Sequence, residues 1–227
     1  MFSGRTIGNS FDTIQKEYIG NVSRSAKGVC ILNKEMVMKY IVACTNLYGI
    51  VPIEKVMEIY NDQNEEKISL DEVERLLQTK RVKEKLEESF VYIQSNEFVA
   101  EATSEEAEKD NLRQNAARKP YYIPGREELL CFIDEEYVQE TPEQLLVKNM
   151  LKEDFGDRLD VDAEVSELVY NLQVSGGDFM MELSSFISRL ELPIKESEHY
   201  IPAIVAVADT TRLWENRGHT TKELQQY

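Results

Sequence analysis

The sequence predicts a mainly α-helical fold: an N-terminal winged-helix-like module of three helices and a β-hairpin, followed by an acidic helical bundle. Three observations lead to this prediction. Apolar residues recur at helical spacing through most of the 227 residues. Capping residues mark the starts of several helices. Two short apolar runs, 90–93 and 98–100, are separated by a turn, as in a hairpin.

The winged-helix-like module begins with an amphipathic helix over residues 34–48. A second helix begins at Pro52, because proline is well suited to a first helical turn. A third begins at Ser69, which has the spacing of a capping box with Glu72. The hairpin then turns at residues 95–96. Three helices followed by a hairpin is the element order of a winged helix.

The second half of the chain is expected to be helical throughout. The predicted helices run from Arg126 to Val138, from Pro142 through Met150, from Asp160 or Asp162 to Gly176, from Phe179 to Leu190, and from about Glu196 to Arg217. In the second of these we expect Leu145, Leu146 and Met150 to point inward. The last helix holds the most apolar stretch, residues 201–208, so we expect it to lie centrally in the bundle.

A polar stretch at residues 102–120 separates the two halves and precedes two prolines. We expect a domain boundary or a solvent-exposed connecting helix there. The predicted division is an N-terminal arm with a short helix (1–33), a winged-helix-like domain (34–101), a polar connector (102–120) and an acidic helical domain (121–227).

The charge and the cysteines limit the class of protein. Lys and Arg number 26 against 42 Asp and Glu, and the formal net charge of −16 opposes binding to nucleic acid or to an anionic membrane. No apolar run is long enough for a membrane helix, and the chain does not begin like a secretory signal, so we expect a cytoplasmic protein. The three scattered cysteines give neither a disulfide framework nor a zinc site, and we expect them to be small buried residues.

The most distinctive segment of the sequence is residues 211–224, TRLWENRGHTTKEL. Gly218 suits a left-handed turn, and Thr220 with Glu223 has the spacing of a capping box, so a helical corner is predicted. Its side chains could bind an anionic or planar ligand or a partner. Alternatively, they could have a structural role, with the tryptophan packed in the core. The candidate residues are Arg212, Trp214, Asn216 and His219.

Three segments of the chain resemble a known group: residues 46–64, 119–124 and 211–220. They are similar to uncharacterised helical proteins of Gram-positive bacteria and mobile elements, a YecA-like group often associated with a SEC-C zinc tail. No cysteine-rich tail is found in the sequence, so the resemblance implies no metal site here. It also implies no enzyme activity.

Metal and catalytic motifs are incomplete. Glu196 and His199 have the Glu-x-x-His spacing of di-iron bundles, but a second such pair is missing. There is no Gly-x-Ser-x-Gly elbow and no glycine-rich phosphate loop, and neither histidine has a neighbouring nucleophile in a known arrangement. We therefore expect no enzyme, no cofactor and no metal.

The preferred hypothesis is a non-catalytic protein-interaction or regulatory protein that docks on a protein partner through its acidic domain or its winged-helix-like module. Acidic residues proposed for this contact are Glu135, Glu136, Asp157 and Asp160. One alternative is a nucleic-acid-mimicking inhibitor from a phage or mobile element. The other is a winged-helix DNA-binding regulator that uses the basic residues between Lys80 and Lys85, with the Ser69 helix at the major groove.

Overall fold

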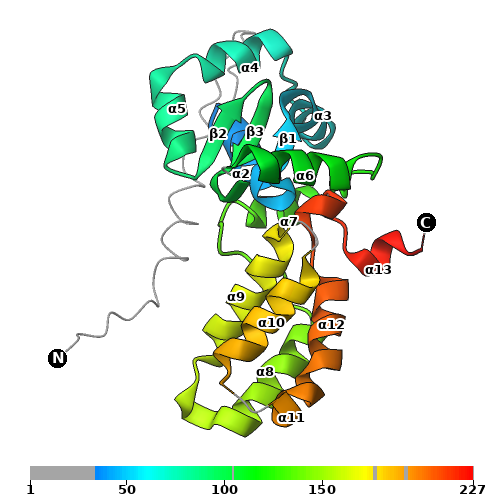
Figure 1. Cartoon of the computed structure of the whole chain (residues 1–227). Coiled ribbons are helices and arrows are strands. Elements are labelled where there is room, and N and C mark those ends of the chain that lie inside the picture. The colour runs from blue at the N-terminus through cyan, green and yellow to red at the C-terminus, as the bar shows by residue number, and fades with distance from the viewer. Residues whose placement is uncertain (1–33, 104, 176–177, 192–193, 227) are drawn as a thin grey trace, which may run out of the picture. The chain divides into compact units, whose positions relative to one another are not determined.

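The computed structural model describes residues 34–103, 105–175, 178–191 and 194–226 (Figure 1). The chain is mainly α-helical with one small antiparallel sheet, which confirms the predicted fold class. The predicted N-terminal arm, residues 1–33, lies outside the described residues. Within the described part, no helix is both long enough and apolar enough to cross a membrane.

The first half contains five helices and the sheet, within the described residues. In chain order they are α2 (Lys34–Tyr48), β1 (Ile50–Pro52), α3 (Ile53–Gln63), α4 (Leu70–Leu77), α5 (Lys80–Glu87), β2 (Val91–Gln94), β3 (Glu97–Ala100), the 3-10 turn η1 (Glu101–Thr103) and α6 (Glu106–Ala116). The strands are antiparallel in the order β1-β3-β2, with Ile50 opposite Val99 and Ile93 opposite Phe98. Ser95 and Asn96 form the predicted turn, and both have the positive φ that a tight hairpin requires.

Two elements of this half were not predicted. The strand β1 has three residues, too few to mark a strand without its partner β3. Helix α5 follows α4 after a two-residue turn and buries only Val82 and Leu86. The helix that directly precedes the hairpin is therefore α5, and not the helix that begins after Ser69.

Helix α6 covers one face of the sheet (Figure 1). Its Leu112 joins Ile50, Val99 and Trp214 in a small apolar core. A domain boundary or a solvent-exposed connecting helix was predicted in this segment. A helix forms there, but one of its sides carries Leu112 and Ala116 at buried positions. Residues 106–116 thus belong to the layer that packs on the sheet.

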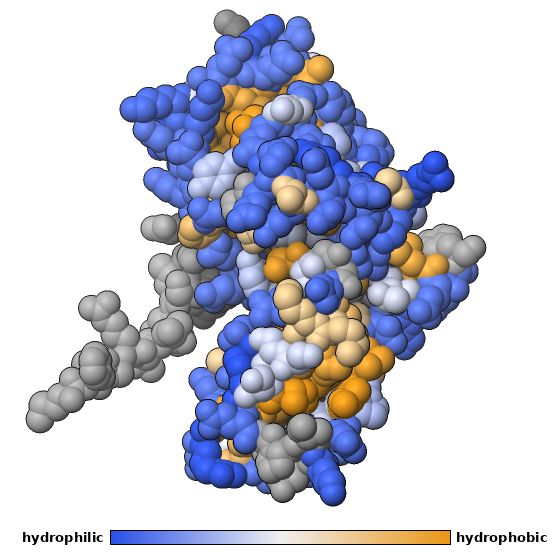
Figure 2. All heavy atoms as spheres, viewed as in Figure 1, coloured by the Kyte–Doolittle hydropathy of each residue, from blue (hydrophilic) through white to orange (hydrophobic). Residues whose placement is uncertain are grey.

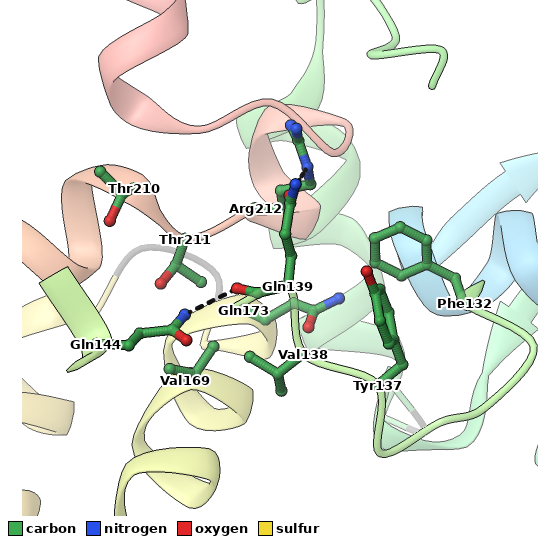
Figure 3. A pocket seen from close by; sticks show the side chains of 10 residues that line it. All are labelled: Phe132, Tyr137, Val138, Gln139, Gln144, Val169, Gln173, Thr210, Thr211 and Arg212. Atoms are coloured by element: carbon green, nitrogen blue, oxygen red, sulfur yellow. Dashed lines mark hydrogen bonds between the residues drawn. The ribbon is translucent and has the colours of Figure 1, made fainter. Parts of the chain in front are cut away.

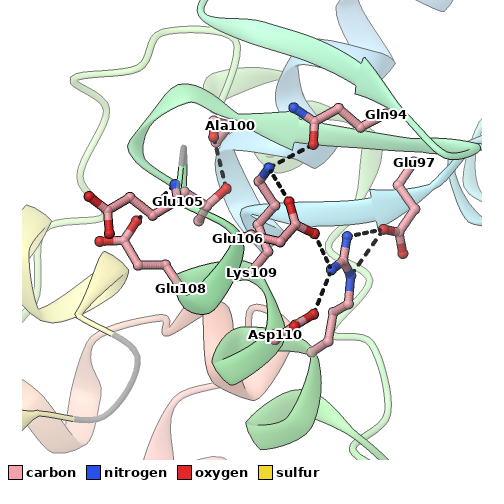
Figure 4. Close-up of polar contacts among 10 residues, drawn as sticks. Gln94, Glu97, Ala100, Glu105, Glu106, Glu108, Lys109 and Asp110 are labelled. Atoms are coloured by element: carbon pink, nitrogen blue, oxygen red, sulfur yellow. Dashed lines mark hydrogen bonds and ion pairs between the residues drawn. The ribbon is translucent and has the colours of Figure 1, made fainter.

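One ion pair and one hydrogen bond attach α6 to the hairpin (Figure 4). The Lys109 side chain is buried, and its Nζ donates to Gln94 Oε1 at 2.8 Å and lies 3.1 Å from Glu106 Oε2. Arg113 Nη2 lies 2.9 Å from Glu97 Oε2. Gln94 and Glu97 flank the hairpin turn, so α6 holds the tip of the hairpin in place.

The second half is a helical bundle (Figure 1). Its elements are α7 (Arg126–Cys131), α8 (Pro142–Phe155), η2 (Gly156–Arg158), α9 (Val161–Val174), α10 (Phe179–Arg189), α11 (Ile194–Ser197), η3 (Glu198–Tyr200), α12 (Ile201–Thr210), η4 (Trp214–Asn216) and α13 (Thr221–Leu224). Helices α8, α9, α10 and α12 run in alternating directions and enclose a core that includes Leu151, Leu168 and Ile204.

Several predicted details of the bundle were wrong. The helix predicted for Glu196 to Arg217 is divided, and α12 ends at Thr210 because Thr211 is extended. Leu145 and Leu146 were predicted to point inward but are 44% and 51% exposed. Cys131 is exposed, whereas Cys44 is buried as predicted.

Candidate functional site

The three segments that carry the family resemblance meet at one place. We call residues 211–224 the C-terminal corner. It packs against the end of α2 and against the loop that follows α6. The contacts among the three segments are Trp214 Nε1 to Asn46 O at 2.8 Å, Tyr48 Oη to Tyr122 O at 2.7 Å, and Arg217 Nη1 to Lys119 O at 2.9 Å. The corner therefore joins parts of the chain that are far apart in sequence.

The Trp214 side chain is packed in the centre of this corner. Its side chain is buried, with 4% exposure, and its only donor, Nε1, is used by the Asn46 carbonyl. The ring lies directly on Gly49, where an added Cβ would come within 2.5 Å of ring carbons. Gly49 also has a φ of +72°, which favours glycine. This geometry matches the predicted structural role of the tryptophan.

Arg212 is surrounded by partners. Its guanidinium lies 3.6 Å from the centre of the Tyr122 ring, a cation–π contact. Nε donates to Gln139 Oε1 at 2.9 Å, and Nη1 donates to Gly218 O at 3.1 Å and pairs with Glu223 at 3.2 Å. The guanidinium nitrogens that could bind an anionic ligand are therefore bound to groups of the chain itself.

Asn216 and His219 are also buried, with exposures of 5% and 6%. Asn216 Oδ1 accepts a hydrogen bond from Lys119 Nζ at 2.7 Å. The His219 Nδ1 lies 3.3 Å from Glu223 Oε2, and the His219 ring packs edge-on against Tyr122. The structure therefore brings all four predicted corner residues together, with Trp214, Asn216 and His219 buried and Arg212 half-buried.

A small pocket lies beside the corner (Figure 3). Its volume is about 20 Å³, which is room for one water molecule rather than for a metabolite. Phe132, Tyr137 and Arg212 line one side, and the amide of Gln144 donates across it to Gln139 O at 3.2 Å. The pocket is too small for a metabolite, and both apolar and polar side chains line it.

The four predicted acidic residues are not brought together. Glu135 lies beyond α7 near Tyr170, and burial together with the neighbouring carboxylates of Glu136 and Asp134 raises the pKa of Glu135. Asp160 caps the opposite end of α9, accepting from Ala163 N, and Asp157 lies in η2. Ten residues of helix, about 15 Å, separate Asp160 from Tyr170. A single acidic stripe is therefore not formed.

Sequence reasoning missed an exposed apolar surface on the bundle. Two methionines of α10, Met180 and Met181, are 64% and 56% exposed, and Ile201 and Val205 of α12 are 38% exposed each. Figure 2 shows apolar surface gathered over these two neighbouring helices. We call these four residues the α10–α12 patch.

Two signals in the sequence could have revealed this patch. Residues 201–208 are apolar on all sides of the helix, yet a helix in a four-helix bundle buries only its inner side. Ala203, Ile204 and Val207 fill that side, so the outer residues remain exposed. Phe179, Met180 and Met181 are three consecutive large apolar residues, and together they span more of the helix circumference than the core side of a bundle helix covers.

The basic residues before the hairpin are exposed on α5. They are Lys80, Arg81, Lys83 and Lys85. Lys80 pairs with Glu84 at 3.3 Å on the same helix, so part of this positive charge is already neutralised. Glu87 and Glu88 are exposed next to it.

His199, from the Glu-x-x-His spacing of the sequence, has other contacts, and the side chain of Glu196 lies outside what the structure describes. Among the described residues, no group of three or more His, Cys, Asp and Glu side chains could hold a metal ion. His199 Nε2 instead lies 3.3 Å from Asp154 Oδ2, and the buried Tyr200 hydroxyl donates to the same carboxylate. These contacts fasten the end of α8 to the start of α12.

Comparison of the chain with protein-family models, curated proteins and solved structures finds no match. The resemblance to the YecA-like group therefore stays a prediction.

Proposed function

We propose that this protein is a non-catalytic adaptor or regulator that binds a protein partner through the α10–α12 patch. The observation that carries the proposal is the exposure of four large apolar side chains on two neighbouring helices. Exposed apolar residues that occur singly need no explanation, but a contiguous group on a folded domain is typical of an interaction site. The sequence predicts docking through the acidic helical domain or the winged-helix-like module. The patch lies on the helical domain but consists of other residues than those predicted.

The C-terminal corner supports the same proposal indirectly. Its arginine, tryptophan and asparagine are used by groups of the chain itself, which leaves little of the corner for a ligand. The corner instead fixes the bundle to the sheet layer: Gln173 of α9 donates to Asn46 O at 3.0 Å beside the tryptophan. A rigid connection of this kind suits a protein that presents a surface to a partner.

The test compares two double variants in the native host. Met180→Ser with Val205→Ser removes apolar groups from the patch, and Leu145→Ser with Leu146→Ser removes equally exposed apolar groups from α8. Tagged wild type and the α8 control should capture the same specific protein, and the patch variant should lose it while keeping its circular dichroism spectrum. A patch variant that retains the partner at wild-type yield would overturn the proposal.

A second function, DNA binding, is favoured by one observation. Helix α5 follows α4 after a short turn, precedes the hairpin and exposes four basic residues, which is the place of a recognition helix in a winged-helix protein. Against it stand the internal pairing of Lys80 and the attachment of the hairpin to α6. A gel shift at low salt that Arg81→Glu with Lys83→Glu abolishes would support it, and no retained duplex would dispose of it.

Mimicry of nucleic acid has less support. A mimic needs its carboxylates on one continuous face, whereas Glu135 and Asp160 lie near opposite ends of α9.

A further inference from the structure

The α10–α12 patch lies on a strongly acidic bundle. Residues 141–210 contain 14 acidic and five basic residues, a net charge of −9. Two of the carboxylates adjoin the patch. Asp178 caps α10 two residues before Met180, and Asp209 follows Val205 by one helical turn. Neither forms an ion pair in the part of the chain that the structure describes.

The shape of the patch suits a helix. Its residues come from two adjacent helices, α10 and α12, which run in opposite directions (Figure 1), so the exposed surface spans both helices. An amphipathic helix recognises such a surface with apolar residues at i, i+3, i+4 and i+7. Methionines favour this contact because their flexible side chains adapt to the occupant.

The alternatives fit less well. A second copy of the chain would bring two bundles of charge −9 together, which opposes association. A segment that binds by adding a strand needs a free sheet edge for its backbone hydrogen bonds, and the patch is made of helices. An anionic bilayer is repelled by the net negative charge of the bundle that carries the patch.

Resting on the proposed function, we infer that the patch binds an amphipathic helix of a partner protein whose apolar stripe is flanked by lysine or arginine. The apolar stripe covers Met180, Met181, Ile201 and Val205. The basic flanks face Asp178 and Asp209. Hydrophobic burial supplies the affinity, and the charges set the orientation and the preference for a basic partner.

The experiment uses the full chain and two synthetic 16-residue peptides. Both carry leucines at the same helical spacing. One has lysines at the flanking positions and the other has glutamates. Binding is measured by fluorescence anisotropy at low and at moderate salt. We expect the lysine peptide to bind at least about tenfold more tightly than the glutamate peptide. The affinity of the lysine peptide should fall as the salt concentration rises.

Two variants locate the binding. Met180→Ser with Val205→Ser should lower the affinity for the lysine peptide at least about tenfold. Leu145→Ser with Leu146→Ser should change that affinity by less than about twofold. The inference is overturned if neither peptide binds, if both bind equally, or if the patch variant binds like wild type. Concentration-dependent dimerisation that the patch variant abolishes would overturn it in favour of a second copy.

The result can be separated from the proposed function. If the patch variant loses the native partner but the two peptides bind equally or not at all, the adaptor function stands and the partner chemistry is wrong. If the lysine peptide binds the patch but the native partner is retained by the patch variant, the adaptor proposal fails at this surface.

Discussion

The C-terminal corner and the α10–α12 patch differ in both sequence and surroundings. The corner combines tryptophan, arginine, asparagine and histidine, residue types typical of binding sites, yet the tryptophan, asparagine and histidine are buried and the arginine is half-buried. The patch consists of methionine, isoleucine and valine, residues typical of a core, and they are exposed.

The difference teaches that residue type alone does not identify a binding surface. Polar and aromatic residues are also what a chain needs where three distant segments must be joined, because every buried polar group requires a partner. Apolar residues beyond those that a core can accommodate are left on the surface. The predictions below contrast the two regions, beginning with the largest effect.

Replacing Trp214 by alanine should lower the free energy of unfolding by roughly 3 to 5 kcal/mol. The change leaves a cavity between Gly49 and Leu112 and removes the hydrogen bond to the Asn46 carbonyl. Urea denaturation followed by circular dichroism measures the loss. Trp214→Phe, which keeps an aromatic ring, should lose less. A loss below about 1 kcal/mol for the alanine variant would mean that the corner is not a structural joint.

Gly49→Ala should destabilise the protein by about 1 to 3 kcal/mol, because the new methyl group meets the Trp214 ring and φ is +72°. The contact with the ring has a specific consequence. In Trp214→Ala the clash is absent, so Gly49→Ala should cost less there, and the double variant should be more stable than the sum of the single changes predicts. Simple additivity would show that the ring and the glycine are not coupled.

The patch should behave in the opposite way. Met180→Ser with Val205→Ser should change the free energy of unfolding by less than about 1 kcal/mol, because both side chains are exposed. The same denaturation series measures it beside Trp214→Ala. A destabilisation as large as that of the tryptophan variant would place these residues in the core and remove the basis of the comparison.

Alkaline pH should weaken the corner. Burial and the hydrogen bond to Glu128 raise the pKa of Tyr122 to about 12, above its ordinary value of 10. At pH values between 10 and about 12, Tyr122 is deprotonated in the unfolded chain and still protonated in the folded chain. The contribution of Tyr122 to the free energy of unfolding is therefore fully present below pH 10 and is lost as the pH rises toward 12. Stability measured from pH 8 to 11.5 should decline less in Tyr122→Phe. An identical decline would exclude Tyr122 as a contributor.

Local signals in the sequence predicted much of the fold. The capping boxes at Ser69 and Thr220 and the hairpin turn at Ser95 and Asn96 depend on neighbours within a few residues, and all of them form. The burial of Trp214 is also confirmed.

Features set by distant contacts could not be predicted in this way. Strand β1 exists only because Ile50 to Pro52 pair with β3, about 45 residues later in the chain. Helix α6 looks polar, but the few apolar residues on one side suffice once the sheet provides a surface for them. The exposure of Val205 depends on which side of α12 faces α8 and α10, which the apolar run itself does not specify.

The most direct test of the account places a photo-crosslinking amino acid at one position at a time in the native host. The positions are Val205 in the patch, Leu145 on α8 and the exposed Lys222 beside the corner. The account predicts a discrete crosslinked product with a second protein from position 205 and none from 145 or 222. A product from position 222 with none from 205 would contradict it, because the corner would then be the binding surface and the patch would not.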